Sequence, residues 1–391
     1  MSTERRDERS TSARTIYTIA VLSCLLHCGF GGSRVTVSLF AIHQNASPAT
    51  IGVLMSLLAL FPTLLAVPLG RLSDRIGARK PAMIGSAGVA LGLLLPACLP
   101  SLTTLFVAVL LLGTSFTFYQ VAISNLVGAL GEPKDRTHNY SILSLGFASA
   151  SFLGPLIAGF GIDHLGHRWT FFVLMLCALV PLAAVGLRPK ILPDIARKSG
   201  EKRDTSVFDL LKIPRLRDVF IVGGVLSAAW DLYQFLLPLY AHSLGFSASV
   251  IGMILATFSL AVFAVRTLIP ALSRRFGDAT VITGAILMCG VAFIAFPFCT
   301  NPWLIAGVSV LLGFGVGAGQ PIAMTLIYNH SPPGRQGEAT GVRVSVNNLA
   351  HVTVPLFFGS VGTALGYMPI FLVNAAVLMA CAYVSKRNFM R

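Results

Sequence analysis

The chain has 391 residues, of which 55% are hydrophobic and only 11% are charged, and its formal net charge is +14. Soluble globular proteins carry charge on about a quarter of their residues, so this composition excludes a soluble enzyme or binding domain. We conclude that the chain is an integral membrane protein.

Twelve apolar runs follow one another along the chain, each near the roughly 20 residues that a helix needs to cross the hydrocarbon core. They lie at about 16–41, 48–69, 81–100, 102–130, 139–161, 169–187, 217–241, 248–270, 279–299, 302–330, 339–361 and 366–385. The first run is too long for a cleavable signal core, so we interpret it as a retained span. The sequence predicts an all-α membrane protein with no soluble domain.

The placement of the cations predicts the orientation. If both termini are cytoplasmic, 25 of the 29 Lys and Arg residues fall in the tails and in the cytoplasmic connections. This is the positive-inside pattern, so we expect both termini in the cytoplasm and no binding of nucleic acid. The seven cysteines lie in or beside apolar runs without metal-ligand spacing. No metal or cofactor is therefore expected.

The two halves of the chain are related by an offset of 200 positions. Identical residues recur at Ile51 and Ile251, Gly52 and Gly252, Gly77 and Gly277, Gly113 and Gly313, Gln120 and Gln320, and Pro155 and Pro355. Two pseudo-symmetric six-helix bundles are predicted, at 1–187 and 218–391, joined by a cytoplasmic linker at 188–217. Parallel repeats of this kind place a binding site near the midplane between the halves and transport by rocking.

The loop after the second run reads GRLSDRIGARK, from Gly70 to Lys80. It matches, at every specified position, a signature of the major facilitator superfamily, and the whole chain resembles a twelve-span member of that family. The resemblance implies a cytoplasmic gate, to which we also assign two arginines near the cytoplasmic ends of spans 8 and 11. The predicted gate residues are Gly70, Asp74, Arg75, Gly77, Arg79, Lys80, Arg266 and Arg343.

A second stretch, ASFLGPLIAG in span 5, resembles the antiporter signature of the drug:proton antiporter branch. Gly154, Pro155 and Gly159 match it, while Ala150 stands for one of its glycines. We expect these small residues to let spans 5 and 8 pack closely. The branch also carries an arginine in span 4 where this chain has Val109, so proton coupling must be arranged by other residues.

One carboxylate, Asp231, lies deep within an apolar run. A charged side chain near the midplane is expensive, so it is expected to face water or a partner and to be functional. At the offset of 200, Asp231 corresponds to Gly31, Gln234 to Arg34 and Ser227 to His27. We expect Asp231 and Arg34 to face each other across a central cavity, either as the proton-coupling site or as a permanent ion pair.

Other polar and aromatic residues in the spans are candidates for substrate contact. Each has a structural alternative, such as an interhelical hydrogen bond or packing, and His27 is either a proton relay or a silent histidine. The predicted substrate-binding residues are Arg34, Tyr119, Gln120, Trp230, Asp231, Tyr233, Gln234, Gln320 and Asn347, and the predicted proton-coupling residues are His27, Arg34 and Asp231.

The run LGFGVGAGQ, from Leu312 to Gln320, has a glycine at every second position from Gly313. A nucleotide-binding loop needs a preceding strand and a helix N-terminus, whereas this run lies inside a predicted span. We therefore expect its glycines to serve the close packing of span 10.

We predict a monomeric bacterial inner-membrane protein that exports small organic compounds by proton antiport and alternating access. The alternative is an organic-anion or metabolite transporter working by proton symport or exchange, since Arg34, Arg266 and Arg343 outnumber Asp231 within the spans. An enzyme is not expected, because no nucleophile, metal motif or soluble face is visible.

Overall fold

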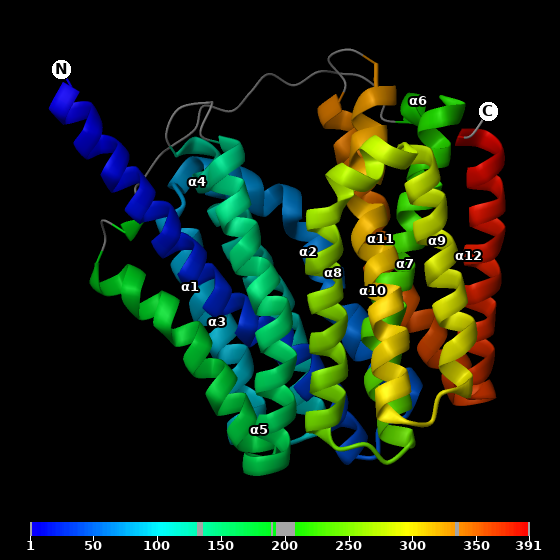
Figure 1. Ribbon diagram of the computed structural model, residues 1–391. Coiled ribbons are helices and arrows are strands. Elements are labelled where there is room, and N and C mark those ends of the chain that lie inside the picture. The colour runs from blue at the N-terminus through cyan, green and yellow to red at the C-terminus, as the bar shows by residue number, and fades with distance from the viewer. Residues whose placement is uncertain (1, 131–135, 189–190, 193–207, 333–335, 390–391) are drawn as a thin grey trace. The chain divides into compact units, whose positions relative to one another are not determined.

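The structure is a computed structural model that describes residues 2–130, 136–188, 191–192, 208–332 and 336–389 (Figure 1). The described residues form helices and no strands. In chain order the elements are α1 (Ser2–His43), α2 (Pro48–Ile76), α3 (Arg79–Cys98), α4 (Leu102–Ala129), α5 (Arg136–Leu187), α6 (Phe208–Leu211), α7 (Pro214–Ser243), α8 (Ala248–Phe276), α9 (Asp278–Ala295), the 3-10 turn η3 (Phe296–Phe298), α10 (Pro302–His330), α11 (Gln336–Leu365) and α12 (Met368–Phe389).

Eleven helices in the described part of the chain are long and apolar enough to cross a membrane. One of them, α5, has 52 residues and contains Gly166 at φ 80° and ψ 166°, which is not a helical conformation. Glycine adopts a positive φ without the strain that a side chain would cause. Figure 1 shows the two arms of α5 meeting at a sharp bend. These arms match two of the predicted runs, so the eleven helices contain the twelve predicted spans.

The chain forms two compact units, which we call unit 1 (Met1–Asn45 and Leu57–Glu201) and unit 2 (Ala46–Ser56 and Lys202–Arg391). In unit 1, α1 packs along α5, and α3 packs on both α4 and α5. In unit 2, α10 packs on α7, α8 and α9, while α11 packs on α7 and α12 on α9. Most of the predicted linker lies outside the described residues.

The first turns of α2 belong to unit 2 because they pack directly on α11. A Cβ atom added at Gly52 would collide with the carbonyl oxygen of Pro355, so only glycine allows the two backbones to approach this closely. The Ser56 hydroxyl donates a hydrogen bond of 2.7 Å to the carbonyl oxygen of Val352. A small residue and a side-chain hydrogen bond thus hold this segment on α11.

Backbone geometry repeats at the offset that the sequence predicts. Helix α2 spans residues 48–76 and α8 spans residues 248–276. Positive φ angles recur in pairs at Asn45 (56°) and Gly245 (81°), Gly77 (75°) and Gly277 (78°), and Gly166 (80°) and Gly366 (76°). Because these are turn positions that end or connect helices, the two repeats share their connections as well as their spans.

The alternating glycines of α10 each meet a neighbouring helix. Added Cβ atoms would clash with Phe258 and Val262 of α8 (from Gly313 and Gly317), with Ala285 of α9 (from Gly315) and with Leu226 of α7 (from Gly319). The glycines therefore let α10 pack tightly against three helices at once. This is the packing role expected from the sequence.

The small residues of the antiporter-like stretch pack on α1. A Cβ added at Gly154 would lie 2.9 Å from the amide nitrogen of Gly32 and 3.0 Å from the carbonyl oxygen of Cys28. Ala150 is 1% exposed and lies one turn away on the same helix, and its carbonyl oxygen would contact a Cβ added at Gly31. Pro155 and Gly159 are buried in the same helix. Gly154 thus packs on α1 within unit 1, while the expected packing of span 5 on span 8 involves both units and stays a prediction.

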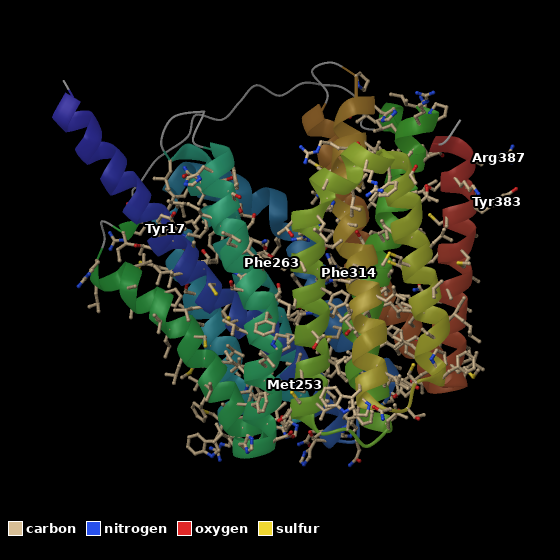
Figure 2. All side chains as sticks on the ribbon, viewed as in Figure 1. Tyr17, Met253, Phe263, Phe314, Tyr383 and Arg387 are labelled. Atoms are coloured by element: carbon tan, nitrogen blue, oxygen red, sulfur yellow. The ribbon has the colours of Figure 1, made fainter. Side chains whose placement is uncertain are left out.

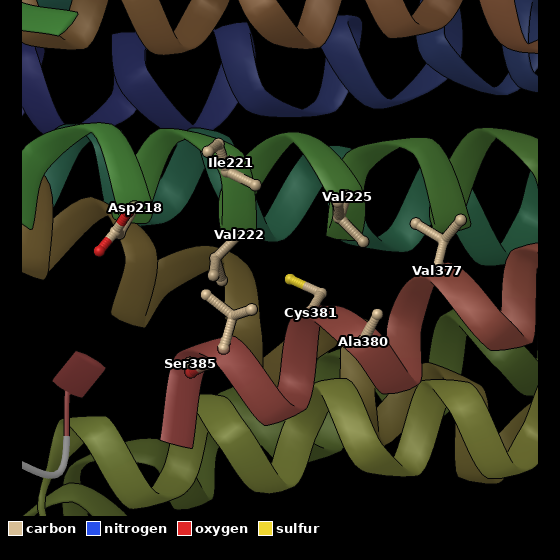
Figure 3. A pocket seen from close by; sticks show the side chains of 9 residues that line it. Asp218, Ile221, Val222, Val225, Val377, Ala380, Cys381 and Ser385 are labelled. Atoms are coloured by element: carbon tan, nitrogen blue, oxygen red, sulfur yellow. The ribbon is translucent and has the colours of Figure 1, made fainter. Parts of the chain in front are cut away.

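Large apolar side chains are exposed on the spanning helices. In Figure 2, Tyr383 and Arg387 project from α12, and the Tyr383 side chain is 70% exposed. An apolar groove of about 300 Å³ runs between α7 and α12, with Asp218 and Ser385 toward one end and Val377 at the other (Figure 3). Exposed apolar side chains on spanning helices are expected to contact lipid.

Candidate functional site

The buried carboxylate of Asp231 pairs with a histidine of another helix. Asp231 lies in α7 and is 1% exposed, and its Oδ1 is 2.6 Å from Nδ1 of His351 in α11. The His351 side chain is 39% exposed, whereas that of Asp231 is 1% exposed. The other carboxylate oxygen, Oδ2, has no hydrogen-bond partner among the described residues. The pair therefore connects a buried acid to a side chain that solvent can reach.

A chain of hydrogen bonds lies beside this pair and links three helices of unit 2. Ser227 Oγ donates to Asn347 Oδ1 at 2.7 Å and accepts from Gln320 Nε2 at 2.8 Å. The Gln320 Oε1 atom accepts from Nη1 of Arg343 at 3.1 Å. Each side chain in this series of hydrogen bonds is polar and uncharged except that of Arg343, which is a guanidinium.

The spacing of these residues follows from two parallel helices. On α11, Arg343, Asn347 and His351 are four residues apart, which places them on one face. The pairs Ser227 with Asn347 and Asp231 with His351 are both separated by 120 residues. A constant separation is what two helices running in the same direction produce, because both rise by about 1.5 Å per residue.

These side chains surround a cavity of about 370 Å³ within unit 2. Its size is in the range of small-molecule sites, about 300–1,000 Å³. The lining comes from α7, α8, α10 and α11 and consists of Ser227, Trp230, Arg266, Gln320, Pro321, Met324, Arg343, Asn347 and His351. It combines two guanidiniums, amides, a hydroxyl and an indole, so it can bind a small molecule that has both polar and apolar parts.

The two arginines carry the charge of the cavity wall. Within the described residues, neither Arg266 nor Arg343 forms an ion pair, and Nε of Arg343 is buried without a partner. None of the described residues that line the cavity is a carboxylate, and Asp231 contacts the lining residue His351. The wall is therefore electropositive.

The structure brings together several of the residues predicted from sequence and leaves others elsewhere. Trp230, Gln320 and Asn347 line the cavity together with Arg266 and Arg343, which the sequence analysis had assigned to the cytoplasmic gate. Two further predicted residues of α7 do not line it. Tyr233 is 1% exposed and stacks on Phe258 at 4.3 Å, and Gln234 is half-buried.

The predicted residues of unit 1 have their own surroundings. His27 hydrogen-bonds through Nδ1 to the carbonyl oxygen of Ser23 at 2.8 Å and stacks on Phe147 at 4.1 Å. Tyr119 is 2% exposed and its hydroxyl lies 3.1 Å from Ser23 Oγ. Gln120 and Arg34 are half-buried. Since Arg34 belongs to unit 1 and Asp231 to unit 2, their expected opposition stays a prediction.

The predicted gate loop is described only in part. Gly77 ends α2 with a φ of 75°, which favours glycine. Arg79 is half-buried at the start of α3, and Lys80 beside it is exposed. The side chains of Gly70, Asp74 and Arg75 lie outside the described part of the chain.

His351 was not predicted from the sequence, and Ser227 was not assigned to a site. Their signal is the stripe at 343, 347 and 351 on span 11, which matches the stripe at 227 and 231 on span 7. Only the second of these stripes was recognised. Met324 and Pro321 carry no polar signal and were found only through the cavity.

Comparison with known proteins gives consistent results. The family described as the Major Facilitator Superfamily matches residues 19–240 and 219–388. The chain is 27% identical to the multidrug resistance protein MdtG of Dickeya zeae (strain Ech586), over 85% of this chain and 83% of that protein. It is also 27% identical to MdtG of Escherichia fergusonii, over 84% of this chain and 81% of that protein.

Solved structures resemble the chain in fold. The nucleoside transporter NupG matches with a TM-score of 0.75 and 18% identity, over 96% of this chain and 99% of that one. A POT family transporter in complex with a thioalcohol-conjugated peptide matches with a TM-score of 0.77 and 13% identity, over 95% and 94% of the two chains. At these identities the likeness concerns the fold alone.

Proposed function

The chain belongs to the major facilitator superfamily, and we propose that it exports small organic compounds across the bacterial cytoplasmic membrane by proton antiport. Membership makes it a multi-pass membrane transporter rather than an enzyme. The finer proposal is supported by the relatives at 27% identity, which are named multidrug resistance proteins and come from bacteria. The antiporter-like stretch around Gly154 supports the same direction of transport.

The observation that carries the proposal is the contact between a buried acid and a cavity-lining histidine. Asp231 is an ionisable group inside a span, and such groups in transporters mark ion and proton paths. His351 touches it at 2.6 Å and also lines the cavity. A proton can therefore pass between the cavity and Asp231 through one side chain. The charged groups that line the same cavity as His351 are Arg266 of α8 and Arg343 of α11.

Protonation would act on the packing of α7 against α11. When Asp231 is ionised, it holds His351 by a charge-assisted hydrogen bond, which is roughly twice as strong as a neutral one. When Asp231 takes up a proton, that contact weakens and the α11 stripe is freed to move. The proposal is that substrate binding and protonation favour different positions of this contact, as alternating access with coupling requires.

The test is transport by purified protein in proteoliposomes under an imposed pH gradient. Asp231→Asn keeps an oxygen that can accept from His351 but cannot carry a proton. We expect gradient-driven transport to be lost while substrate exchange without a gradient persists. Asp218→Asn, on the same helix beside Arg217, is the matched control and should transport normally. Full coupled transport by Asp231→Asn would refute the proton role.

The second candidate is transport of an organic anion by proton symport or exchange. It is favoured by Arg266 and Arg343, which give the cavity a positive wall. The two candidates share the cavity and the proton site and differ in direction. The assay uses inside-out vesicles with an acidic lumen. Accumulation of the compound in the lumen, driven by the outward proton gradient, indicates antiport, whereas exit of the compound from the lumen together with protons indicates symport.

A further inference from the structure

We propose that the substrates carry an oxyanionic group, and that this group binds Arg343 and Arg266 by displacing the side chain of Gln320. The inference rests on the proposed function in one respect, namely that the cavity of unit 2 is the substrate site. It specifies the anionic group that the second candidate left open, and it adds a residue that occupies the anion's place when no substrate is bound.

The first support is the charge of the wall. Two arginines line a cavity of about 370 Å³, and none of the other lining residues in the described part of the chain is acidic. Within the described residues neither arginine has an ionic partner. Unpaired cations inside a membrane span are costly and are kept where a function needs them. A positively charged cavity wall repels organic cations and attracts organic anions.

The second support is the way in which Arg343 is bonded. Its Nη1 donates to the neutral amide oxygen of Gln320 at 3.1 Å, while its Nε is buried with no partner in the described part of the chain. A guanidinium offers five donors in a planar fork that fits a carboxylate or phosphate-type oxyanion. An oxyanion adds attraction between opposite charges and can accept two parallel N–H bonds from the fork, which the neutral amide oxygen of Gln320 cannot. An entering anion therefore outcompetes the amide.

The third support is the second attachment of Gln320. Its amide nitrogen donates to Ser227 Oγ at 2.8 Å, and Ser227 in turn donates to Asn347 at 2.7 Å. The amide is thus tethered between the arginine and α7. When an anion binds Arg343, Gln320 loses the hydrogen bond of its amide oxygen but keeps that of its amide nitrogen to Ser227. A movement of Gln320 therefore acts on α7 one turn before Asp231. This places anion binding and the proton site on the same helix face.

The apolar part of the substrate has a defined place. Trp230 and Met324 also line the cavity, and the Trp230 ring is fixed edge-to-face against Phe258 at 5.0 Å. Aromatic and thioether side chains bind apolar groups without requiring one fixed shape. The expected ligand is therefore a small organic acid with an apolar body.

One test needs no ligand. Gln320→Glu is nearly isosteric and places a permanent carboxylate beside Arg343, so it imitates the bound anion. We expect it to raise the Tm of the purified protein and the double variant Gln320→Glu/Arg343→Gln to lose that gain. Gln44→Glu, outside the cavity, adds the same charge as a control. Both variants lack the amide donor to Ser227, so a Tm of Gln320→Glu no higher than that of the double variant would overturn the inference.

The second test uses compounds that share one apolar body. A thermal-shift assay and a binding titration measure how the purified protein binds three such compounds: 2-naphthoate, 2-naphthamide and 2-naphthylmethylamine. We expect the carboxylate to bind, and Arg343→Gln or Gln320→Glu to weaken it at least tenfold. Arg274→Gln removes an exposed cation from the same helix as Arg266 and should leave binding unchanged.

The outcomes separate this inference from the proposed function. Preference for the amine, or equal binding of all three compounds, overturns the inference while leaving proton antiport intact. Binding of the carboxylate that depends on Arg343, together with transport indifferent to Asp231→Asn, supports the inference and refutes the proton role. Failure of all three compounds to bind, with no Tm gain in Gln320→Glu, overturns it as well.

Discussion

Ser227 holds the polar chain of the cavity together, and its replacement by alanine is expected to loosen the site. Its hydroxyl accepts from Gln320 at 2.8 Å and donates to Asn347 at 2.7 Å, and the residue is 4% exposed. A hydrogen bond contributes about 0.5–1.5 kcal/mol net, so Ser227→Ala should lower the free energy of unfolding by about 1–3 kcal/mol. Since every 1.4 kcal/mol is tenfold, the loss corresponds to roughly 5- to 150-fold in the equilibrium.

The matched control for Ser227→Ala is Ser86→Ala in α3. Ser86 is also buried, at 1% exposed, but its hydroxyl donates only to the carbonyl oxygen of Ala82 in its own helix. Bonds of this kind do not stabilise a helix, so this variant should change little. The assay is thermal unfolding in detergent, followed by initial transport rates in proteoliposomes. Equal Tm values for the two variants and a normal rate for Ser227→Ala would refute the reasoning.

Two further predictions concern helix packing and the proton site. Gly154→Ala places a methyl group 2.9 Å from the Gly32 nitrogen, and overpacking costs about 1–3 kcal/mol, so the Tm of this variant should fall. The control is Gly284→Ala, whose methyl group meets nothing within 4 Å and which should gain up to about 1 kcal/mol of helix propensity. Equal shifts from both alanines would contradict the packing. His351→Phe keeps a ring but removes the bond to Asp231, worth about 1.5–3 kcal/mol, so pH-driven transport should fall at least about tenfold. A rate within about twofold of the original would exclude a role for that bond.

The fold could be predicted from the sequence because the membrane imposes simple requirements. Every backbone group in hydrocarbon must be hydrogen-bonded within its own helix, so span number follows from apolar length. The repeat also carries its turn glycines: Gly77 and its counterpart Gly277, which the offset of 200 pairs in the sequence, both adopt the positive φ that glycine allows.

The candidate site was predictable only in part. Asp231 was identified because a carboxylate in an apolar run needs a partner, but the partner found in unit 2, His351, lies 120 residues away. Sequence periodicity gives the face of each helix and not which two faces meet. Arg266 and Arg343 were assigned to the gate from their helical positions. Long arginine side chains carry their charge far from the backbone, so the position of Cα did not reveal that the guanidiniums line the cavity.

The two repeats use the same contact between helices with different types of side chain. Ser227 and Asn347 correspond, at the offset of 200, to His27 and Phe147, and both pairs are in contact. The contact is a hydrogen bond of 2.7 Å in unit 2 and a ring stack of 4.1 Å in unit 1. The helix pairs α1 with α5 and α7 with α11 therefore meet in the same register, with polar side chains in one repeat and aromatic ones in the other.

The same comparison locates the ionic chemistry in the second repeat. Asp231 and His351 correspond to Gly31 and Ser151, and the Ser151 hydroxyl donates within its own helix, to the carbonyl oxygen of Phe147 at 2.9 Å. Gly31 has no side chain with which an ion could be bound. The first repeat thus lacks both members of the acid and histidine pair, just as it lacks the span-4 arginine at Val109. Neither matched position of the first repeat carries a carboxylate or an imidazole, so the pairing of acid and histidine in this register is confined to α7 and α11.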